Sequence, residues 1–107
     1  MLIPFTMDKK EKEVILKKLE EVVDPELYVD IVSLGLVYEL SKNENNDLTI
    51  LMTLTFPGCP YGDTLKEQVR EAAEELGKYN SVEVELTFNP PWSPDKIDPD
   101  VRAALNI

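Results

Sequence analysis

Apolar residues recur at helical spacing in two segments of this chain and alternate with polar residues in three others. The first helical segment can be capped by Asp8 and runs to about Val22. Its predicted apolar stripe comprises Ile15, Leu19, Val22 and Val23, with Val14 off to one side. Asp24-Pro25 ends the helix, because a residue before proline is pushed out of helical geometry.

A second helix is predicted from about Asp63 to Lys78. Thr64 followed by Glu67 fits a capping box, and Gly77 fits a C-terminal stop. The buried stripe is predicted to be Leu65, Val69, Ala72, Ala73 and Leu76. A short third helix is expected to start at Asp98, with Pro99 in its first position.

The alternating segments predict three strands, over residues 36–41, 48–55 and 81–88. In the second strand one face is predicted to carry Leu48, Ile50, Met52 and Leu54, and the other Thr49, Leu51, Thr53 and Thr55. In the third strand Val82, Val84, Leu86 and Phe88 are predicted to point inward. The first two strands are joined by a polar turn and should form an antiparallel hairpin, whereas the third could lie beside either of them.

The order helix, strand, strand, helix, strand predicts an α+β fold: a two-layer α-β-β-α-β domain with helices on one face of a small sheet, plus the short C-terminal helix. We expect residues 1–107 to form a single domain, with residues 1–7 as a loose leader. The irregular stretch 24–35 is apolar for a loop, so it is expected to pack on the domain.

Charge and composition narrow the classes of partner. The net charge is −10 and no basic stripe is visible, which argues against nucleic acid and anionic lipid as partners. No apolar run approaches the ~20 residues that cross a bilayer. One cysteine allows no internal disulfide, which fits a reducing compartment, so we expect a cytoplasmic protein.

Cys59 is the most informative candidate for chemistry. It lies in Phe-Pro-Gly-Cys-Pro, between the predicted second strand and second helix. A nearby helix N-terminus favours the thiolate, while Asp63 and Glu67 in the first turn oppose a second anion. A bound cation or iron would favour the thiolate. The alternative is that Cys59 is a small buried apolar residue.

Further candidates each have a structural alternative. Asp24 and Glu26 flank Pro25 and could be metal ligands or a binding pair, or could cap neighbouring backbone amides. Thr53 and Thr55 could contribute to binding or serve as ordinary strand formers. Trp92, held among prolines, could close the core or form a contact platform, and we expect it to be partly buried.

Several ordered motifs resemble the SufT/PaaD-type family of iron–sulfur cluster assembly domains, long catalogued as a domain of unknown function. The matching segments are Asp24-Pro25-Glu26-Leu27, residues 30–37, residues 52–55, Gly58-Cys59-Pro60 and Pro90-Pro91-Trp92. The resemblance covers nearly the whole chain. It implies an accessory or carrier role in cluster assembly or transfer, with iron–sulfur scaffolds and apo-client proteins as partners. It makes Cys59 the candidate functional residue and places the family's acidic pair on Asp24 and Glu26.

One cysteine and no histidine limit the chemistry of a single chain. A monomer cannot supply the four thiolates that a cluster usually takes, nor a Cys-His nucleophilic site. A homodimer could bridge a labile [2Fe–2S] cluster through Cys59 of each subunit, or Cys59 could be one transient ligand during handover. We therefore predict a carrier of a transient cluster or iron, with none bound permanently, and not an enzyme.

Two other classes stay open. A thiol enzyme, such as a hydrolase or reductase, would need a base or a resolving cysteine that the chain lacks. A protein-interaction module without metal would use the tail around Trp92 and the apolar stretch from Ile31 to Val37 to dock a partner.

Overall fold

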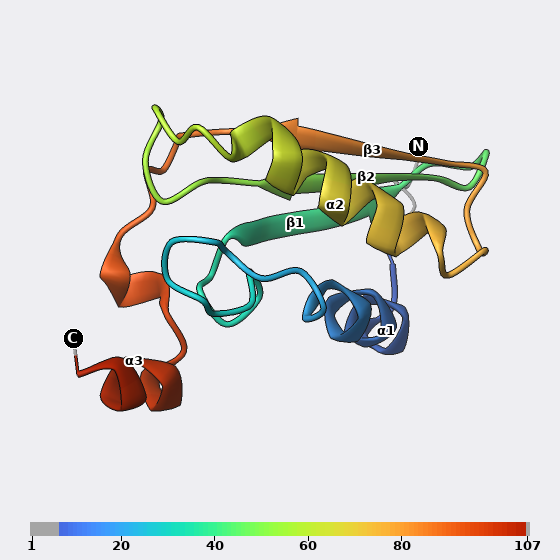
Figure 1. The fold of residues 1–107 in the computed structure, drawn as a ribbon. Coiled ribbons are helices and arrows are strands. Elements are labelled where there is room, and N and C mark those ends of the chain that lie inside the picture. Colours follow the sequence, from blue (N-terminus) through green and yellow to red (C-terminus); the bar gives the residue numbers. More distant parts are fainter. Residues whose placement is uncertain (1–6, 107) are drawn as a thin grey trace.

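The computed structural model describes residues 7–106 and confirms the α+β architecture (Figure 1). Its elements in chain order are α1 (Lys9–Leu19), β1 (Val37–Lys42), β2 (Asp47–Met52), α2 (Gly62–Glu74), β3 (Ser81–Leu86), the 3-10 turn η1 (Pro94–Lys96) and α3 (Pro99–Leu105). Residues 1–6 of the predicted leader lie outside the described residues, while Met7 is buried against the core.

The sheet has the order β1-β2-β3 and settles the pairing that the sequence left open. β1 and β2 form the predicted antiparallel hairpin, with Leu40 opposite Ile50. β3 pairs with β2 in parallel, with Ile50 opposite Val84. A parallel pair needs a crossover connection, which α2 supplies. The carboxyl ends of β2 and β3 therefore meet at one edge of the sheet.

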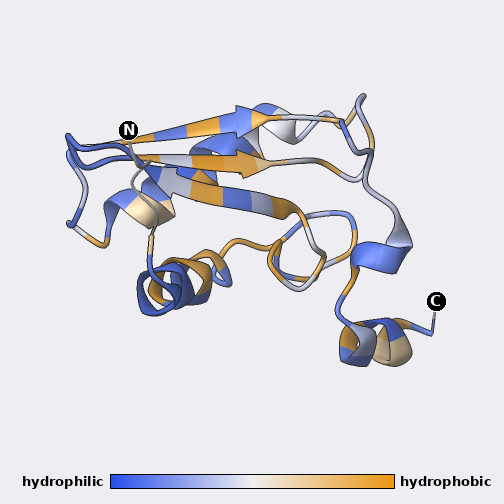
Figure 2. Cartoon of the chain, turned by 180° about the vertical axis from the view of Figure 1, so that it is seen from behind, coloured by the Kyte–Doolittle hydropathy of each residue, from blue (hydrophilic) through white to orange (hydrophobic). Residues whose placement is uncertain are grey.

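The core lies between the sheet and a layer formed by α1 and α2 (Figures 1 and 2). The inward face of β2 carries Leu48, Ile50 and Met52, all fully buried. From the helices, the core receives Ile15, Leu19, Leu65, Val69 and Ala73. Both apolar stripes are those that the spacing predicts, except at their C-terminal ends. Within the described residues no helix is both long enough and apolar enough to span a bilayer.

The end of α1 differs from the prediction. Asp8 caps the helix as expected, accepting a hydrogen bond from the Glu11 N–H at 2.7 Å. The helix ends at Leu19, however, well before the Asp-Pro pair. Val23 therefore falls outside the helical stripe: it forms an isolated bridge with Asp30 and is 46% exposed. Its predicted place in the core is wrong.

The start of α2 also differs. The helix begins at Gly62, and its N-cap is Tyr61, which makes no side-chain capping bond. The capping box predicted for Thr64 and Glu67 is therefore wrong, because both residues already lie inside the helix. The helix ends at Glu74 rather than near Lys78. Gly77, predicted as the stop, lies three residues beyond that end with φ +65°, and its N–H donates to the Glu74 carbonyl.

Two predicted strands end early, which changes where their last side chains lie. β2 ends at Met52, so Thr53 leaves the alternation and is fully buried beside Met52 and Leu54 instead of sharing an outer face with Thr55. β3 ends at Leu86, so Phe88, predicted to point inward, is 37% exposed.

The C-terminal tail is tied to the loop that precedes β1. The Asp98 N–H donates to the Ser33 carbonyl at 2.8 Å. Gly35 has φ +75°, and a Cβ at this position would lie 2.3 Å from the carbonyl oxygen of Lys96. Only glycine fits so close an approach of two backbones. The tail therefore packs against residues 31–36, as expected for an apolar loop. Asp98 caps α3, accepting from the Asp100 N–H, as predicted.

Candidate functional site

The candidate site lies at the edge of the sheet where β2 and β3 end. The Thr53 N–H donates to the Leu36 carbonyl at 2.8 Å, and the Thr87 N–H donates to the Met52 carbonyl at 2.9 Å. These bonds join three segments that are distant in sequence: the loop before β1 and the loops after β2 and β3. The two latter loops run beside each other at this end of the molecule (Figure 1).

Cys59 stands at the junction of two consecutive turns. Its N–H donates to the Phe56 carbonyl, and its own carbonyl accepts from the Gly62 N–H, both at 3.2 Å. Pro57 and Pro60 each occupy the second position of one turn, where the fixed φ of proline fits. The prolines that flank the cysteine therefore set the backbone that presents it, and the second turn leads directly into α2.

The side chain of Cys59 is half-buried and packs against the core. It is neither sealed in the interior nor fully exposed. Its neighbours in the turn are more open: Phe56 is 40% exposed and Tyr61 is 44% exposed. Phe88, in the loop after β3, is also 37% exposed, and the strand patterns predicted none of these three exposed aromatic side chains. The sequence does place Phe56 and Tyr61 on either side of the proline-containing turn, and this position could have indicated that both side chains are exposed.

Asp24 behaves as a structural cap. It is 1% exposed, and its Oδ1 accepts hydrogen bonds from the N–H groups of Glu26 at 2.7 Å and Leu27 at 3.1 Å. Its backbone N–H donates to the Val29 carbonyl. The capping alternative thus describes Asp24, while Glu26 is exposed.

The two candidate threonines differ in their surroundings. Thr53 is fully buried, and its hydroxyl donates over 3.5 Å to the carbonyl of Leu54. The Oγ1 of Thr55 is buried without a hydrogen-bond partner among residues 7–106. Both lie in the segment that leads from β2 to the Cys59 turn.

Trp92 ties the C-terminal tail to the loop before β1. It is partly buried, as predicted, and its Nε1–H donates to the Leu34 carbonyl at 2.6 Å. Ile31, Leu34 and Leu36 are themselves fully buried. The tail and the apolar stretch before β1 therefore pack on each other, and much of the surface expected for partner docking faces inward.

Within residues 7–106, no group of three or more His, Cys, Asp or Glu side chains is arranged to hold a metal ion. The roles assigned to Cys59, Asp24 and Glu26 as ligands stay predictions. A clear pKa shift lies at the other end of the sheet, away from Cys59. There, burial and the hydrogen bond to Glu11 raise the pKa of Tyr79.

Comparison with known proteins gives one consistent family. A family model described as "Iron-sulfur cluster assembly protein" matches residues 12–86. The Fe-S protein maturation auxiliary factor YitW of Bacillus subtilis is 44% identical, over 94% of this chain and 99% of its own. The corresponding factor SufT of Staphylococcus aureus is 38% identical, over 80% of this chain and 98% of its own.

A solved structure has the same fold. It is the crystal structure of a domain of unknown function from Bacillus anthracis, which aligns with a TM-score of 0.85 and 38% identity, over 92% of this chain and 94% of that one.

Proposed function

Because this chain belongs to the family of iron–sulfur cluster assembly proteins, we propose that it is an accessory or carrier factor that delivers clusters to apo-proteins through Cys59. Two relatives carry the name Fe-S protein maturation auxiliary factor. In this proposal the cluster, or iron alone, is cargo, and Cys59 is a shared and temporary ligand. The protein itself is not an enzyme.

The setting of Cys59 carries the proposal. Two proline-containing turns fix the backbone on either side of it, and one side of the side chain rests on the core. The residues around it, including Pro57, Gly58 and Pro60, are exposed. A partner can therefore approach a thiol whose position is already fixed, which lowers the entropic cost of forming a shared ligand sphere.

The count of ligands explains why binding would be temporary. The chain has one cysteine and no histidine, and Asp24 already holds two backbone amides. Clusters are usually held by four ligands, so most of them must come from a second copy, from small thiols, or from the donor and acceptor proteins. Binding that needs a second molecule is readily reversed when that molecule leaves.

Anaerobic reconstitution with iron and sulfide tests the ligand role. Visible absorption would report cluster binding, and transfer to an apo-ferredoxin would report delivery. We expect Cys59→Ser to lose most of both. The matched control combines Cys59→Ser with Ser81→Cys, which restores one thiol at an exposed position on the opposite edge of the sheet.

The outcomes show whether a thiol is needed at position 59 or whether any exposed thiol is enough. If the relocated cysteine restores binding and transfer, any accessible thiol suffices and the assigned site is wrong. If Cys59→Ser holds and transfers cluster like the wild type, Cys59 is no ligand. The mass of the loaded protein distinguishes a cluster bridged by two copies from one held in a mixed complex.

A metal-free interaction module is the second candidate, and the exposed aromatic residues favour it. Phe56, Tyr61 and Phe88 are at least 37% exposed, and aromatic side chains often dominate protein interfaces. Under this alternative Cys59→Ser would leave client binding intact, while a combined Phe56→Ser and Tyr61→Ser variant would abolish it in a pull-down.

A further inference from the structure

Gly62 is the first residue of α2 and lies against Leu54, in the segment that follows β2. A Cβ at this position would lie 2.9 Å from the Cδ1 of Leu54, closer than side chains normally approach. Leu54 is 3% exposed and belongs to the core, so its side chain has little room to yield. The start of α2 is therefore seated on the core at a distance that favours glycine.

The backbone conformation of Gly62 does not itself require glycine. Its φ lies outside the left-handed region, and glycine weakens a helix relative to alanine. Gly58, in the preceding turn, is a useful contrast, because a Cβ there would meet the Phe56 ring at 3.7 Å, an ordinary contact. The close approach to Leu54 is thus the feature that accounts for glycine at position 62.

The same residue closes the turn that follows Cys59. The Gly62 N–H donates to the Cys59 carbonyl at 3.2 Å, and the Leu65 N–H donates to the Tyr61 carbonyl at 2.8 Å as the helix begins. The Cys59 side chain is half-buried and packs on the core. Moving the start of α2 away from Leu54 would therefore draw the Gly62 N–H away from the Cys59 carbonyl and loosen the turn that holds the thiol.

We propose that Gly62 is a positioning residue for the Cys59 thiol, because its contact with Leu54 fixes the turn against the core. This role rests on the proposed function, in which Cys59 is a temporary ligand. Leu54 is itself held in place, since the N–H of the preceding Thr53 donates to the Leu36 carbonyl at 2.8 Å. The position of the thiol is thus set from the end of β2, through Leu54 and Gly62, and not by the flanking prolines alone.

Alkylation of the iron-free full chain by iodoacetamide reports the position of the thiol. The chain has one cysteine, so the reaction rate belongs to Cys59. We expect Gly62→Ala to react about three- to tenfold faster, because opening the turn relieves the overpacked contact. Transfer of a cluster to apo-ferredoxin should become slower, because the ligand is no longer held in place. Faster alkylation together with slower transfer is the signature of a displaced thiol.

Leu54→Val supplies the rescue. It removes one carbon from the contact, and Gly62→Ala adds one from the other side. Each single variant should be alkylated faster than the wild type, whereas the double variant should return to the wild-type rate, because residues in contact are coupled. If circular dichroism shows that Gly62→Ala does not fold, the double variant is compared with Leu54→Val alone. A double variant that reacts as fast as Leu54→Val overturns the proposal.

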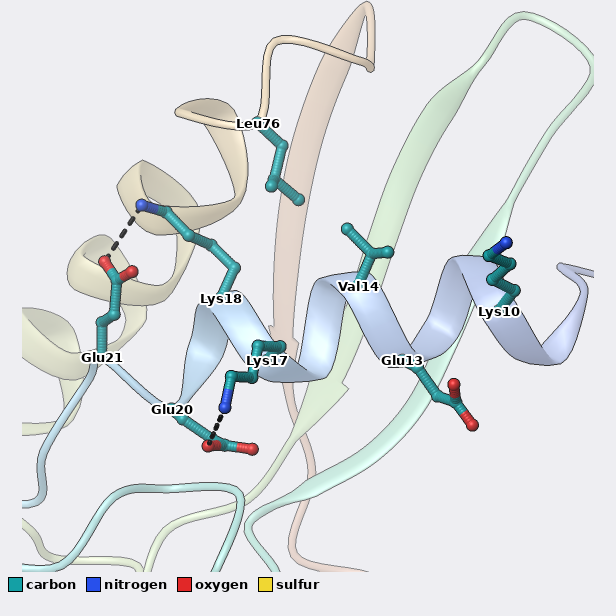
Figure 3. Close-up of a pocket in the computed structure, with 8 residues that line it drawn as sticks. All are labelled: Lys10, Glu13, Val14, Lys17, Lys18, Glu20, Glu21 and Leu76. Carbon is teal, nitrogen blue, oxygen red and sulfur yellow. Dashed lines mark hydrogen bonds and ion pairs between the residues drawn. The ribbon is translucent and has the colours of Figure 1, made fainter.

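Two controls separate this contact from general effects. Gly58→Ala adds the same methyl group one residue before Cys59, where there is room, and should be alkylated at nearly the wild-type rate. Leu76→Ala removes a side chain that packs on the core just beyond the other end of α2. Figure 3 shows Leu76 pointing into a groove of about 770 Å³ beside α1. Its loss should lower the stability of the fold without touching the Cys59 turn.

Urea distinguishes opening of the turn from unfolding of the whole domain. Alkylation through global unfolding accelerates steeply with urea, whereas alkylation through a local opening changes little at low urea concentration. We expect the second behaviour for Gly62→Ala and the first for any increase in Leu76→Ala. A steep dependence in Gly62→Ala would show that general loss of stability exposes the thiol, and it would overturn the proposal.

The remaining outcomes also decide. Alkylation of Gly62→Ala at the wild-type rate, or no faster than that of Gly58→Ala, overturns the proposal. So does normal transfer by Gly62→Ala when Cys59→Ser has lost transfer, because the position of the thiol would then not matter. The alkylation measurements use no iron, so they still decide whether Gly62 positions the thiol if Cys59→Ser transfers cluster like the wild type. Failure of this role and failure of the proposed function are therefore distinguishable.

Discussion

The carboxylate of Asp24 gives a direct test of whether this residue is a structural cap. Asp24→Ala removes the acceptor for the N–H groups of Glu26 and Leu27. Asp24→Asn keeps an Oδ1 acceptor in the same place while it removes the charge. We therefore expect the alanine variant to be clearly destabilised and the asparagine variant to stay close to the wild type.

The size of the loss can be worked from the two hydrogen bonds. Each contributes a net ~0.5–1.5 kcal/mol to the free energy of unfolding, so losing both costs about 1–3 kcal/mol. For a domain near 100 residues, 1 kcal/mol shifts Tm by about 4–8 °C. A central loss of about 2 kcal/mol therefore lowers Tm by roughly 8–16 °C.

Urea denaturation followed by far-UV circular dichroism measures this loss, and a thermal melt gives Tm. Trp92 fluorescence reports whether the loop and the tail separate first, since this side chain donates a hydrogen bond to Leu34. If Asp24→Asn loses as much stability as Asp24→Ala, the charge matters more than the cap. If Asp24→Ala unfolds like the wild type, the capping bonds contribute nothing, and the reasoning from their geometry is refuted.

Gly35 and Glu11 carry two further predictions. Gly35→Ala should cost at least about 2 kcal/mol in the free energy of unfolding, because its Cβ would collide with the Lys96 backbone. Gly77→Ala is the matched control, because Gly77 has a similar φ but open space around it. Equal urea midpoints for the two variants would contradict the clash. Burial raises the pKa of Glu11, but hydrogen bonds led by that from Tyr79 outweigh it and leave the pKa below the ordinary 4.5. The stabilisation from this carboxylate is therefore present above about pH 4.5 and lost as the pH falls below that value. The difference in the free energy of unfolding between wild type and Glu11→Gln should narrow in this acidic range. A difference that stays constant from neutral pH into acid would refute this prediction.

Local pattern predicts the interiors of the elements better than their ends. The alternation of β2 holds through Leu48, Ile50 and Met52, because each residue there is paired on both sides. It fails at Thr53, whose N–H turns to the Leu36 carbonyl. That acceptor is 17 positions away in the sequence, so no pattern within β2 could reveal where the strand stops.

The place of β3 in the sheet could not be predicted for a related reason. Alternating apolar residues state which face a strand buries but not which neighbour it pairs with. The crossover through α2 makes β3 parallel to β2, and this places the ends of both strands, and thus the Cys59 turn, at one edge. The prolines around Cys59 predicted the turn correctly because their effect on the backbone is local.

The acidic pair around Pro25 shows where prediction of the site reached its limit, and it leads to a last prediction. In sequence, Asp24 and Glu26 look equivalent, but folding buries the first as a cap and leaves the second exposed. Asp24 cannot serve as a ligand without giving up the amides that it holds, whereas Glu26 is exposed and its carboxylate accepts no hydrogen bond within the described residues. If the pair contributes to cargo binding, Glu26 is therefore the carboxylate that does so.

In the anaerobic transfer assay, we expect Glu26→Gln to slow delivery to the apo-ferredoxin without lowering the stability of the fold. Asp24→Asn, which retains the cap, should transfer at the wild-type rate and is the matched control, because it removes the same charge two residues away. The reverse result would place the ligand at Asp24 and would require the loop to open during transfer. Equal loss in both variants would indicate only a general effect of local charge, because the two substitutions share nothing else.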